Sequence, residues 1–138
     1  MVVMVMDGQG GGIGSLIIKA LRAAVPEDTE ILALGTNSAA AARMMKAGAN
    51  RGAAGENAIV QTSSKADVIM GPLAVLMAHA MMGEVTPRMA EAVSASRAKK
   101  ILIPLNQEGV RLVGIANDPL PHLVEEAVSV VKEMARHV

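Results

Sequence analysis

The sequence predicts an α/β fold in which helices cover both faces of a doubly wound, mostly parallel sheet. Three observations support this prediction. Short apolar runs alternate with segments in which apolar residues recur at helical spacing. Glycines cluster where the first apolar run meets the first helical segment. The 138 residues are enough for one hydrophobic core, so we expect a single domain spanning residues 1–138.

The first elements are the clearest. Residues 2–6 are all apolar, as expected of a central parallel strand that is buried on both faces. A helix is predicted over 13–24, because its apolar residues share one face. The second strand is expected at 30–34. Ser38 is the predicted N-cap of a second helix over 39–46.

The middle of the chain is more ambiguous. A short edge strand is expected over 50–54. Residues 55–64 fit either a helix or a strand, and we prefer the helix because parallel strands need a crossover connection between them. The next strand is expected at 67–70. The wholly apolar segment 73–82 is interpreted as a buried helix.

The last third of the chain should add two helices and an edge hairpin. Thr86 is the predicted N-cap of a helix over 87–97, with a proline at its first position. A strand over 101–105 is expected to turn back into residues 110–115, which gives an antiparallel hairpin at the sheet edge. A final amphipathic helix is predicted from Pro121 onward. Its inward residues should be Leu123, Val124, Ala127, Val130, Val131 and Met134.

The composition excludes several classes of function. Without Cys there is no disulfide, zinc-thiolate site, iron–sulfur cluster or thiol nucleophile. Without aromatic residues no nucleobase can stack on a ring, and a net charge of +0 gives no field that attracts nucleic acid or a membrane surface. A hydrophobic fraction of 51% in a neutral chain favours a homo-oligomer. The lack of Cys and of a recognisable targeting segment favours a cytoplasmic location.

The strongest functional signal is the junction between the first strand and the first helix. Glycines there let the backbone approach an anion, and a helix start offers unpaired N–H groups and a positive dipole end. We therefore predict a phosphate-binding loop, whose residues are Gly8, Gln9, Gly10, Gly11, Gly12, Ile13 and Gly14. The alternative is that these glycines only allow a tight turn and close packing of the helix on the sheet.

The spacing of Gly8, Gly12 and Gly14, with Ile13 between the last two, resembles the cofactor loop of the short-chain dehydrogenases/reductases. The resemblance covers about residues 1–35 and implies a Rossmann-like fold with an NADP or NAD cofactor. It does not imply the same enzyme, because that family's catalytic Tyr cannot exist in a chain without Tyr. No Lys follows the glycines, which excludes a Walker A loop.

Further candidates lie at the carboxyl ends of other strands, where open α/β sheets bind their ligands. Thr36, Asn37 and Ser38 follow the second strand in place of the acidic residue that is usual in NAD sites. With Arg43 one turn further on, they favour a ligand with a 2′-phosphate, and hence NADP over NAD. The alternative is that Asn37 and Ser38 only cap the helix.

Other polar residues have weaker claims. Gly71-Pro72 ends a later strand and is included in the predicted cofactor site. Arg51 lies in a second glycine-rich loop and either clamps a phosphate or is simply exposed. Glu56 is a candidate base or ribose ligand, or only complements a helix dipole. Glu84 is expected to be a plain cap. No His, Asp and Glu set has the spacing of a metal site.

Several stretches together point to a family. They are residues 7–14, 33–37, 47–52, 55–58, 66–67, 71–72, 83–84, 86–87 and 119–122. Through them nearly the whole chain resembles an uncharacterised family of short bacterial proteins, known only as a domain of unknown function. The resemblance brings no activity with it.

The sequence therefore predicts a nucleotide-binding protein that holds NADP or NAD, with no evident proton donor for catalysis. Two alternatives stay open. One is a small enzyme that holds a phosphorylated metabolite at the glycine loop, with Arg51, Glu56 or Asn106 doing the chemistry. The other is a non-catalytic sensor whose oligomeric state responds to a nucleotide.

Overall fold

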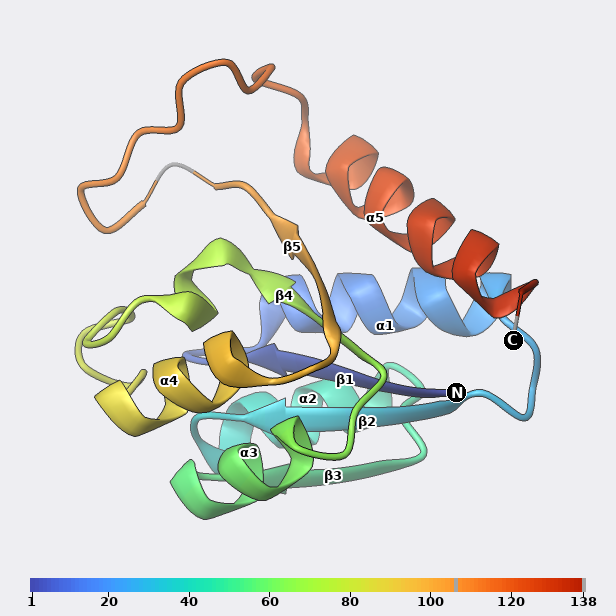
Figure 1. Ribbon diagram of the computed structural model, residues 1–138, viewed down its shortest axis with the longest axis horizontal. Helices are drawn as coiled ribbons and strands as arrows, with labels where there is room; N and C mark the ends of the chain where they lie inside the picture. Colours follow the sequence, from blue (N-terminus) through green and yellow to red (C-terminus); the bar gives the residue numbers. More distant parts are fainter. Residues whose placement is uncertain (106, 138) are drawn as a thin grey trace.

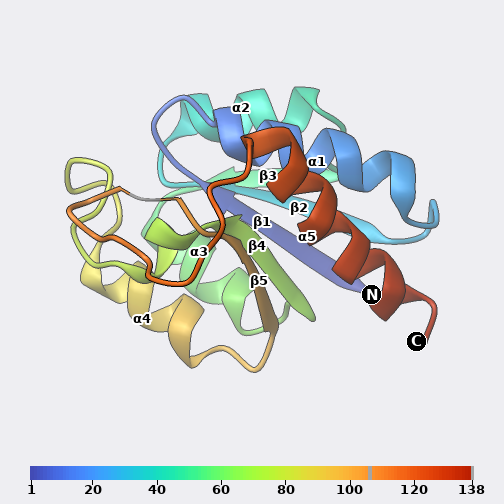
Figure 2. The same ribbon diagram turned by 90° about the horizontal axis from the view of Figure 1, so that it is seen from above.

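The computed structural model describes residues 1–105 and 107–137. Its centre is a five-stranded sheet with the strand order β3-β2-β1-β4-β5, in which every neighbouring pair is parallel (Figures 1 and 2). The strands are β1 (Val2–Asp7), β2 (Glu30–Gly35), β3 (Arg51–Ala54), β4 (Val68–Pro72) and β5 (Lys99–Ile103). The chain winds outward from β1 in one direction and then in the other, which is the Rossmann-like, doubly wound arrangement. The predicted fold class is confirmed.

Helices cover both faces of this sheet. They are α1 (Gly12–Ala24), α2 (Ser38–Lys46), α3 (Glu56–Ser63), the short 3₁₀ helix η1 (Leu73–Leu76), α4 (Pro87–Ala95) and α5 (Leu120–Ala135). One core lies between the sheet and α1, α2 and α5. The second lies between the sheet and α3, η1 and α4. No helix among the described residues is long and apolar enough to cross a membrane.

The two cores explain the apolar run that begins the chain. Side chains alternate between the two faces along a strand. Val3 and Val5 of β1 accordingly lie in the first core, and Met4 and Met6 lie in the second. Both faces are covered, so every position of the strand must be apolar until Asp7 is reached at its carboxyl end.

Several local predictions are confirmed. Residues 51–54 form the edge strand β3, and the ambiguous segment 55–64 contains the preferred helix. Thr86 caps α4, because its hydroxyl accepts a hydrogen bond from the N–H of Met89 at 3.2 Å. The cap of α2 is one residue earlier than expected. Asn37 fills this position, and its side chain accepts from the N–H of Ala40 at 2.8 Å.

The predicted antiparallel hairpin is wrong. The edge strand β5 ends at Ile103, and residues 107–119 run as an irregular arm without strand pairing (Figure 1). Most residues of 110–115 are apolar, but Gly114 has a φ of 82° and turns the chain within the expected strand. Val113 consequently points into solvent and is 95% exposed.

The predicted helix over 73–82 is also wrong. Only residues 73–76 are helical, as η1, and turns follow. His79, Met81 and Met82 have φ values of 72°, 57° and 57°, which a right-handed helix does not allow. In α5 a smaller error concerns Val130, which was expected to face inward and is exposed.

Candidate functional site

The candidate site lies at the edge of the sheet formed by the carboxyl ends of β1, β2 and β4, called here the carboxyl edge. Residues 8–14, the glycine loop, lead from β1 into α1. The loop turns tightly, because the N–H of Gly11 donates to the carbonyl of Gly8 at 2.9 Å. Gly11 has a φ of 72°, the left-handed conformation that glycine adopts at little cost. This turn directs the start of α1 back over the end of β1.

Asp7 occupies the space beneath this turn. Its side chain is buried, and its two carboxylate oxygens accept hydrogen bonds from the N–H groups of Gly8 and Gly14, each at 2.8 Å. Burial raises the pKa of Asp7, although the N–H groups of Gly14, Gly8 and Ile13 and the charge of Arg43 act in the opposite direction. Asp7 therefore fixes the two ends of the loop, and the N–H groups of Gly8 and Gly14 are not free to bind a ligand. An acidic residue directly after an apolar strand is the sequence signal for this role.

Gly10 and Gly12, on either side of the buried Gly11, are more open. The N–H groups of Gly10 and Gly12 donate to no protein group that the structure describes. A methyl group added at Gly10 would meet only the guanidinium of Arg43, at 3.8 Å. Arg43 is exposed on α2 and donates to the carbonyl of Gly10 at 3.3 Å. Unpaired N–H groups, a helix start and a guanidinium together suit a phosphate.

The structure brings Thr36 and Asn37 to the glycine loop. The N–H of Thr36 donates to the carbonyl of Asp7 at 3.0 Å, and the Asn37 amide donates to the carbonyl of Gln9 at 3.0 Å. Ser38 follows them as an exposed residue in the first turn of α2. The ends of β1 and β2 thus form one continuous polar surface.

Glu84 is a further member of this surface that the sequence interpretation missed. One carboxylate oxygen, Oε1, accepts from the Thr36 hydroxyl at 2.6 Å, from the N–H of Gln9 at 2.8 Å and from the Asn37 amide at 2.8 Å. The Thr36 hydroxyl, with the N–H of Gln9, lowers the pKa of Glu84. The expectation of a plain helix cap is therefore wrong. Thr86 is the cap, and Glu84 reaches across to the glycine loop.

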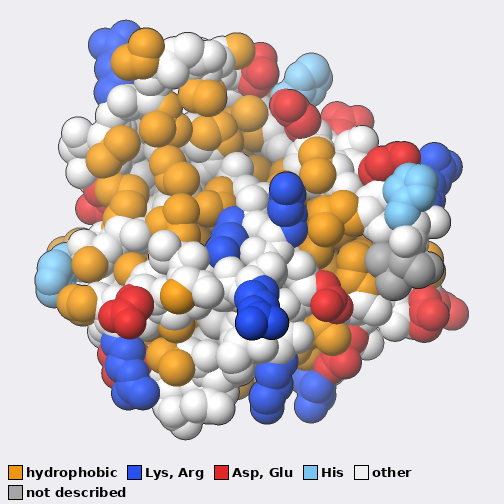
Figure 3. Space-filling view, in the orientation of Figure 1, with side chains coloured by type: hydrophobic (Ala, Val, Ile, Leu, Met, Phe, Trp, Pro, Cys, Tyr) orange, Lys and Arg blue, Asp and Glu red, His pale blue; other side chains and the backbone are white. Residues whose placement is uncertain are grey.

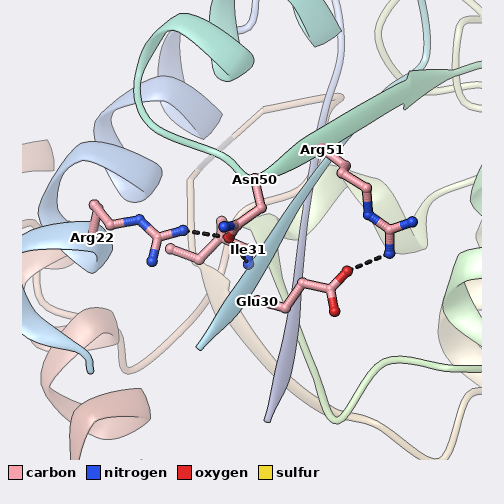
Figure 4. A network of polar contacts seen from close by, with 5 residues as sticks. All are labelled: Arg22, Glu30, Ile31, Asn50 and Arg51. Carbon is pink, nitrogen blue, oxygen red and sulfur yellow. Dashed lines mark hydrogen bonds and ion pairs between the residues drawn. The ribbon is translucent and has the colours of Figure 1, made fainter. Parts of the chain in front are cut away.

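Arg51 does not belong to this surface. It is the first residue of β3 and lies opposite Leu32, so it sits at the other, amino edge of the parallel sheet. Its guanidinium pairs with the carboxylate of Glu30 (Figure 4). The expected edge strand over 50–54 is therefore right, but Arg51 stands at its amino end, away from the glycine loop, and not in a loop that could clamp a phosphate there.

Gly71 and Pro72 lie at the carboxyl edge but are buried as the last residues of β4. A Cβ on Gly71 would stand 2.3 Å from the carbonyl oxygen of Met6, so close strand packing accounts for this glycine.

The remaining candidates are Glu56 and Asn106. Glu56 accepts a hydrogen bond from the Thr86 hydroxyl at 2.6 Å and is therefore already engaged. Asn106 lies outside the described residues. Within 1–105 and 107–137, no three His, Asp or Glu side chains are grouped as a metal site would need.

A second surface lies beside the edge strand β5. A hollow of about 330 Å³ separates β5 from the arm over 107–119 and from α5. Its apolar lining includes Ile101, Leu102, Pro104, Ile115, Leu123 and Val130. Figure 3 shows hydrophobic side chains gathered on the face of the molecule that carries β5.

Two solved structures resemble parts of this fold. Apo saccharopine dehydrogenase (L-Glu forming) from Saccharomyces cerevisiae has 14% sequence identity and a TM-score of 0.46, over 78% of this chain and 22% of that one. A universal stress protein in complex with cAMP has 20% identity and a TM-score of 0.41, over 72% of this chain and 94% of that one. The chain thus spans about a fifth of the dehydrogenase.

No curated protein matches the sequence significantly. A family model does match, and it covers residues 2–136. The chain therefore belongs to the family described as "Domain of unknown function (DUF3842)".

Proposed function

We propose that this protein binds a nucleotide of the NAD or NADP type at the carboxyl edge, with the phosphates on residues 10–12 of the glycine loop. The observation that carries the proposal is the pair of N–H groups of Gly10 and Gly12, which have no partner among the described residues and stand at the start of α1 beside Arg43. These are the donors that a phosphate group uses at a helix start.

The glycines of the loop support this proposal because they differ in their surroundings. A Cβ on Gly14 would stand 2.3 Å from the sulfur of Met44, so packing alone accounts for a glycine there. Gly10 and Gly12 have no such neighbour, and neither has a positive φ. A glycine without a structural reason costs about 0.5–1 kcal/mol relative to alanine in regular structure. Close approach of a ligand to the backbone supplies the missing reason.

The proposal is limited to binding. The carboxylates at this edge, Asp7 and Glu84, both accept hydrogen bonds from the backbone of the loop. The alternative of an enzyme for a phosphorylated metabolite has less support. Arg51 lies at the amino edge, and Glu56 is engaged with Thr86.

Titration calorimetry tests the proposal. We expect NAD⁺ or NADP⁺ to bind to the wild type, and Gly10→Asp to weaken that binding by about tenfold or more, because its carboxylate would repel the phosphates. Gly10→Ala is the matched neutral variant and should cause a smaller loss, with unchanged thermal unfolding. Arg51→Ala, at the other edge, should bind as the wild type does. An absence of binding at millimolar nucleotide contradicts the proposal, and inorganic phosphate binding as tightly as either nucleotide would favour the metabolite enzyme.

We also propose that the chain forms a homo-oligomer through the surface beside β5. This strand is an unpaired edge of the sheet, and Val113, Ile115 and Val130 expose 95%, 50% and 42% of their surface nearby. Light scattering on the purified protein should give a multiple of 14.2 kDa. The same measurement with NAD⁺ present tests the sensor alternative, which requires the assembly to change. A monomer under both conditions contradicts both the homo-oligomer and the sensor.

A cytoplasmic location stays a prediction.

A further inference from the structure

The position of Glu84 suggests which nucleotide the site selects. Its Oε1 atom lies between the glycine loop and the end of β2, because its three donors belong to Gln9, Thr36 and Asn37. In doubly wound sheets the ribose of a bound dinucleotide occupies this place, and an acidic residue at the end of the second strand accepts hydrogen bonds from its hydroxyl groups. In this chain Gly35 and Thr36 stand at the end of the second strand, and neither is acidic.

The backbone that carries Glu84 is held firmly in place. Residues 77–86, called the Glu84 segment, follow η1 as a series of turns. The N–H of His79 donates to the carbonyl of Val85 at 2.6 Å, and the N–H of Met81 donates to the carboxylate of Glu108 at 2.7 Å. Three of its non-glycine residues have positive φ values, which cost of order 1–3 kcal/mol each unless their surroundings enforce them. These two hydrogen bonds and the contacts of Glu84 with the glycine loop fix the segment at the carboxyl edge.

Gly8 makes the close approach possible. A Cβ on Gly8 would stand 2.5 Å from the hydroxyl oxygen of Thr36 and 3.0 Å from Oε1 of Glu84. A side chain at this position would displace the Thr36 hydroxyl and would crowd the carboxylate that accepts from it. The first glycine of the loop is thus explained by close packing against Thr36, Met81 and Glu84, the Met81 sulfur lying 2.6 Å from the added Cβ, in contrast to Gly10 and Gly12.

The carboxylate has one oxygen engaged and one available. All three hydrogen bonds go to Oε1, and Oε2 has no partner among residues 1–105 and 107–137. The lowered pKa means that Glu84 is ionised at neutral pH. A free carboxylate oxygen accepts hydrogen bonds from a pair of ribose hydroxyls, whereas a 2′-phosphate beside it would add like charge.

We infer that Glu84 is the ribose-binding and specificity-determining residue of this site, and that it selects a nucleotide with a free ribose 2′-hydroxyl, such as NAD, over one with a 2′-phosphate. The inference rests on the proposed nucleotide binding. It reverses the expectation of NADP, because Thr36 and Asn37 already donate to a carboxylate of this chain. Arg43 contacts Gly10, on the side where the proposal places the bridging phosphates.

The test compares NAD⁺ and NADP⁺ by titration calorimetry in the wild type and in Glu84→Gln. The glutamine carbonyl can still accept from the same three donors, but the charge is lost. We expect the wild type to bind NAD⁺ about tenfold more tightly than NADP⁺. In Glu84→Gln, NAD⁺ should bind several-fold more weakly and NADP⁺ more tightly, so that the preference falls to about one.

A merely structural role predicts a different pattern. Glu108→Ala removes the anchor of the Glu84 segment and leaves the carboxylate intact, so it should weaken both nucleotides by the same factor. If Glu84→Gln also changes both affinities equally, or if the wild type prefers NADP⁺, this inference is overturned while the proposed function stands. If the wild type binds neither nucleotide, the proposed function fails and the inference fails with it.

Discussion

The two edges of the sheet use similar side chains in different ways. At the carboxyl edge, Asp7 is buried and Glu84 is held by three donors, and most of their partners are backbone N–H groups or short side chains. At the amino edge, Arg51 and Glu30 pair in the open, with side chains 75% and 36% exposed (Figure 4). An exposed ion pair contributes little to stability, whereas a buried acceptor serving several N–H groups is costly to remove. What separates the two edges is the number of hydrogen-bond donors that each carboxylate serves and, for Asp7, its burial.

The largest expected effect comes from steric fit at the carboxyl edge. A Cβ on Gly35, where β2 turns into α2, would stand 2.4 Å from the carbonyl oxygen of Asn37 and 2.7 Å from the backbone nitrogen of Ala41. These are backbone atoms, so the start of α2 would have to move. We expect Gly35→Ala to lower the free energy of unfolding by about 3 kcal/mol in urea denaturation. Gly10→Ala, whose added methyl group meets only the Arg43 guanidinium at ordinary contact distance, should change it by less than about 0.5 kcal/mol. Equal losses would contradict the distinction between packed and open glycines.

A smaller effect is expected at the buried carboxylate. Asp7→Ala removes the acceptor of the N–H groups of Gly8 and Gly14. The loss of these bonds is partly offset because a buried charge disappears as well. We expect the free energy of unfolding at neutral pH to fall by about 2 kcal/mol. An unchanged unfolding midpoint would mean that the two ends of the loop do not depend on Asp7.

The same variant has a defined pH dependence. Burial raises the pKa of Asp7 above its ordinary value of 3.8, so the folded protein holds this proton more tightly than the unfolded chain. The extra stability that comes from protonating Asp7 is therefore complete below pH 3.8 and is lost as the pH rises through the native pKa, which leaves at neutral pH the hydrogen bonds of the ionised carboxylate. Glu84 has the opposite pH dependence. Its pKa in the folded protein lies below the ordinary 4.5, so the stability that its ionised carboxylate adds is lost as the pH falls through the pKa of the folded protein. The stability gap between wild type and Asp7→Ala should widen on acidification, and the gap for Glu84→Gln should narrow.

Much of the fold could be predicted from the sequence, because a strand that is buried on both faces must be apolar at nearly every position. The apolar run of β1 and the Thr86-Pro87 start of α4 are examples. The Glu84 segment could not be predicted. Its apolar composition matches a buried helix, but Met81 and Met82 have positive φ values, which nothing in their residue type signals, and Met82 is exposed.

The candidate site was predictable only where its residues directly follow a strand of the sheet. The glycine loop and the end of β2 meet because parallel strands end at the same edge. Glu84 comes from a distant segment, and its contact with Gln9 spans 75 positions. Arg51 was wrongly included because it lies among the glycines of residues 48–57, although the strand expected over 50–54 puts it at the amino end of β3, away from the carboxyl edge.

The smallest expected effect concerns Arg51 and completes the comparison of the two edges. Arg51→Ala removes an exposed ion pair with Glu30, so the free energy of unfolding should fall by less than about 1 kcal/mol. Its neighbour Asn50 is the internal control, because its side-chain oxygen accepts from the N–H of Ile31 at 2.8 Å and from the guanidinium of Arg22. Asn50→Ala should therefore cost more than Arg51→Ala, about 1–2 kcal/mol in urea denaturation. If Arg51→Ala lowers the free energy of unfolding more than Asn50→Ala does, the exposed ion pair stabilises the amino edge more than its exposure predicts. If it also weakens nucleotide binding, the two edges are coupled and the separation argued from the strand register is wrong.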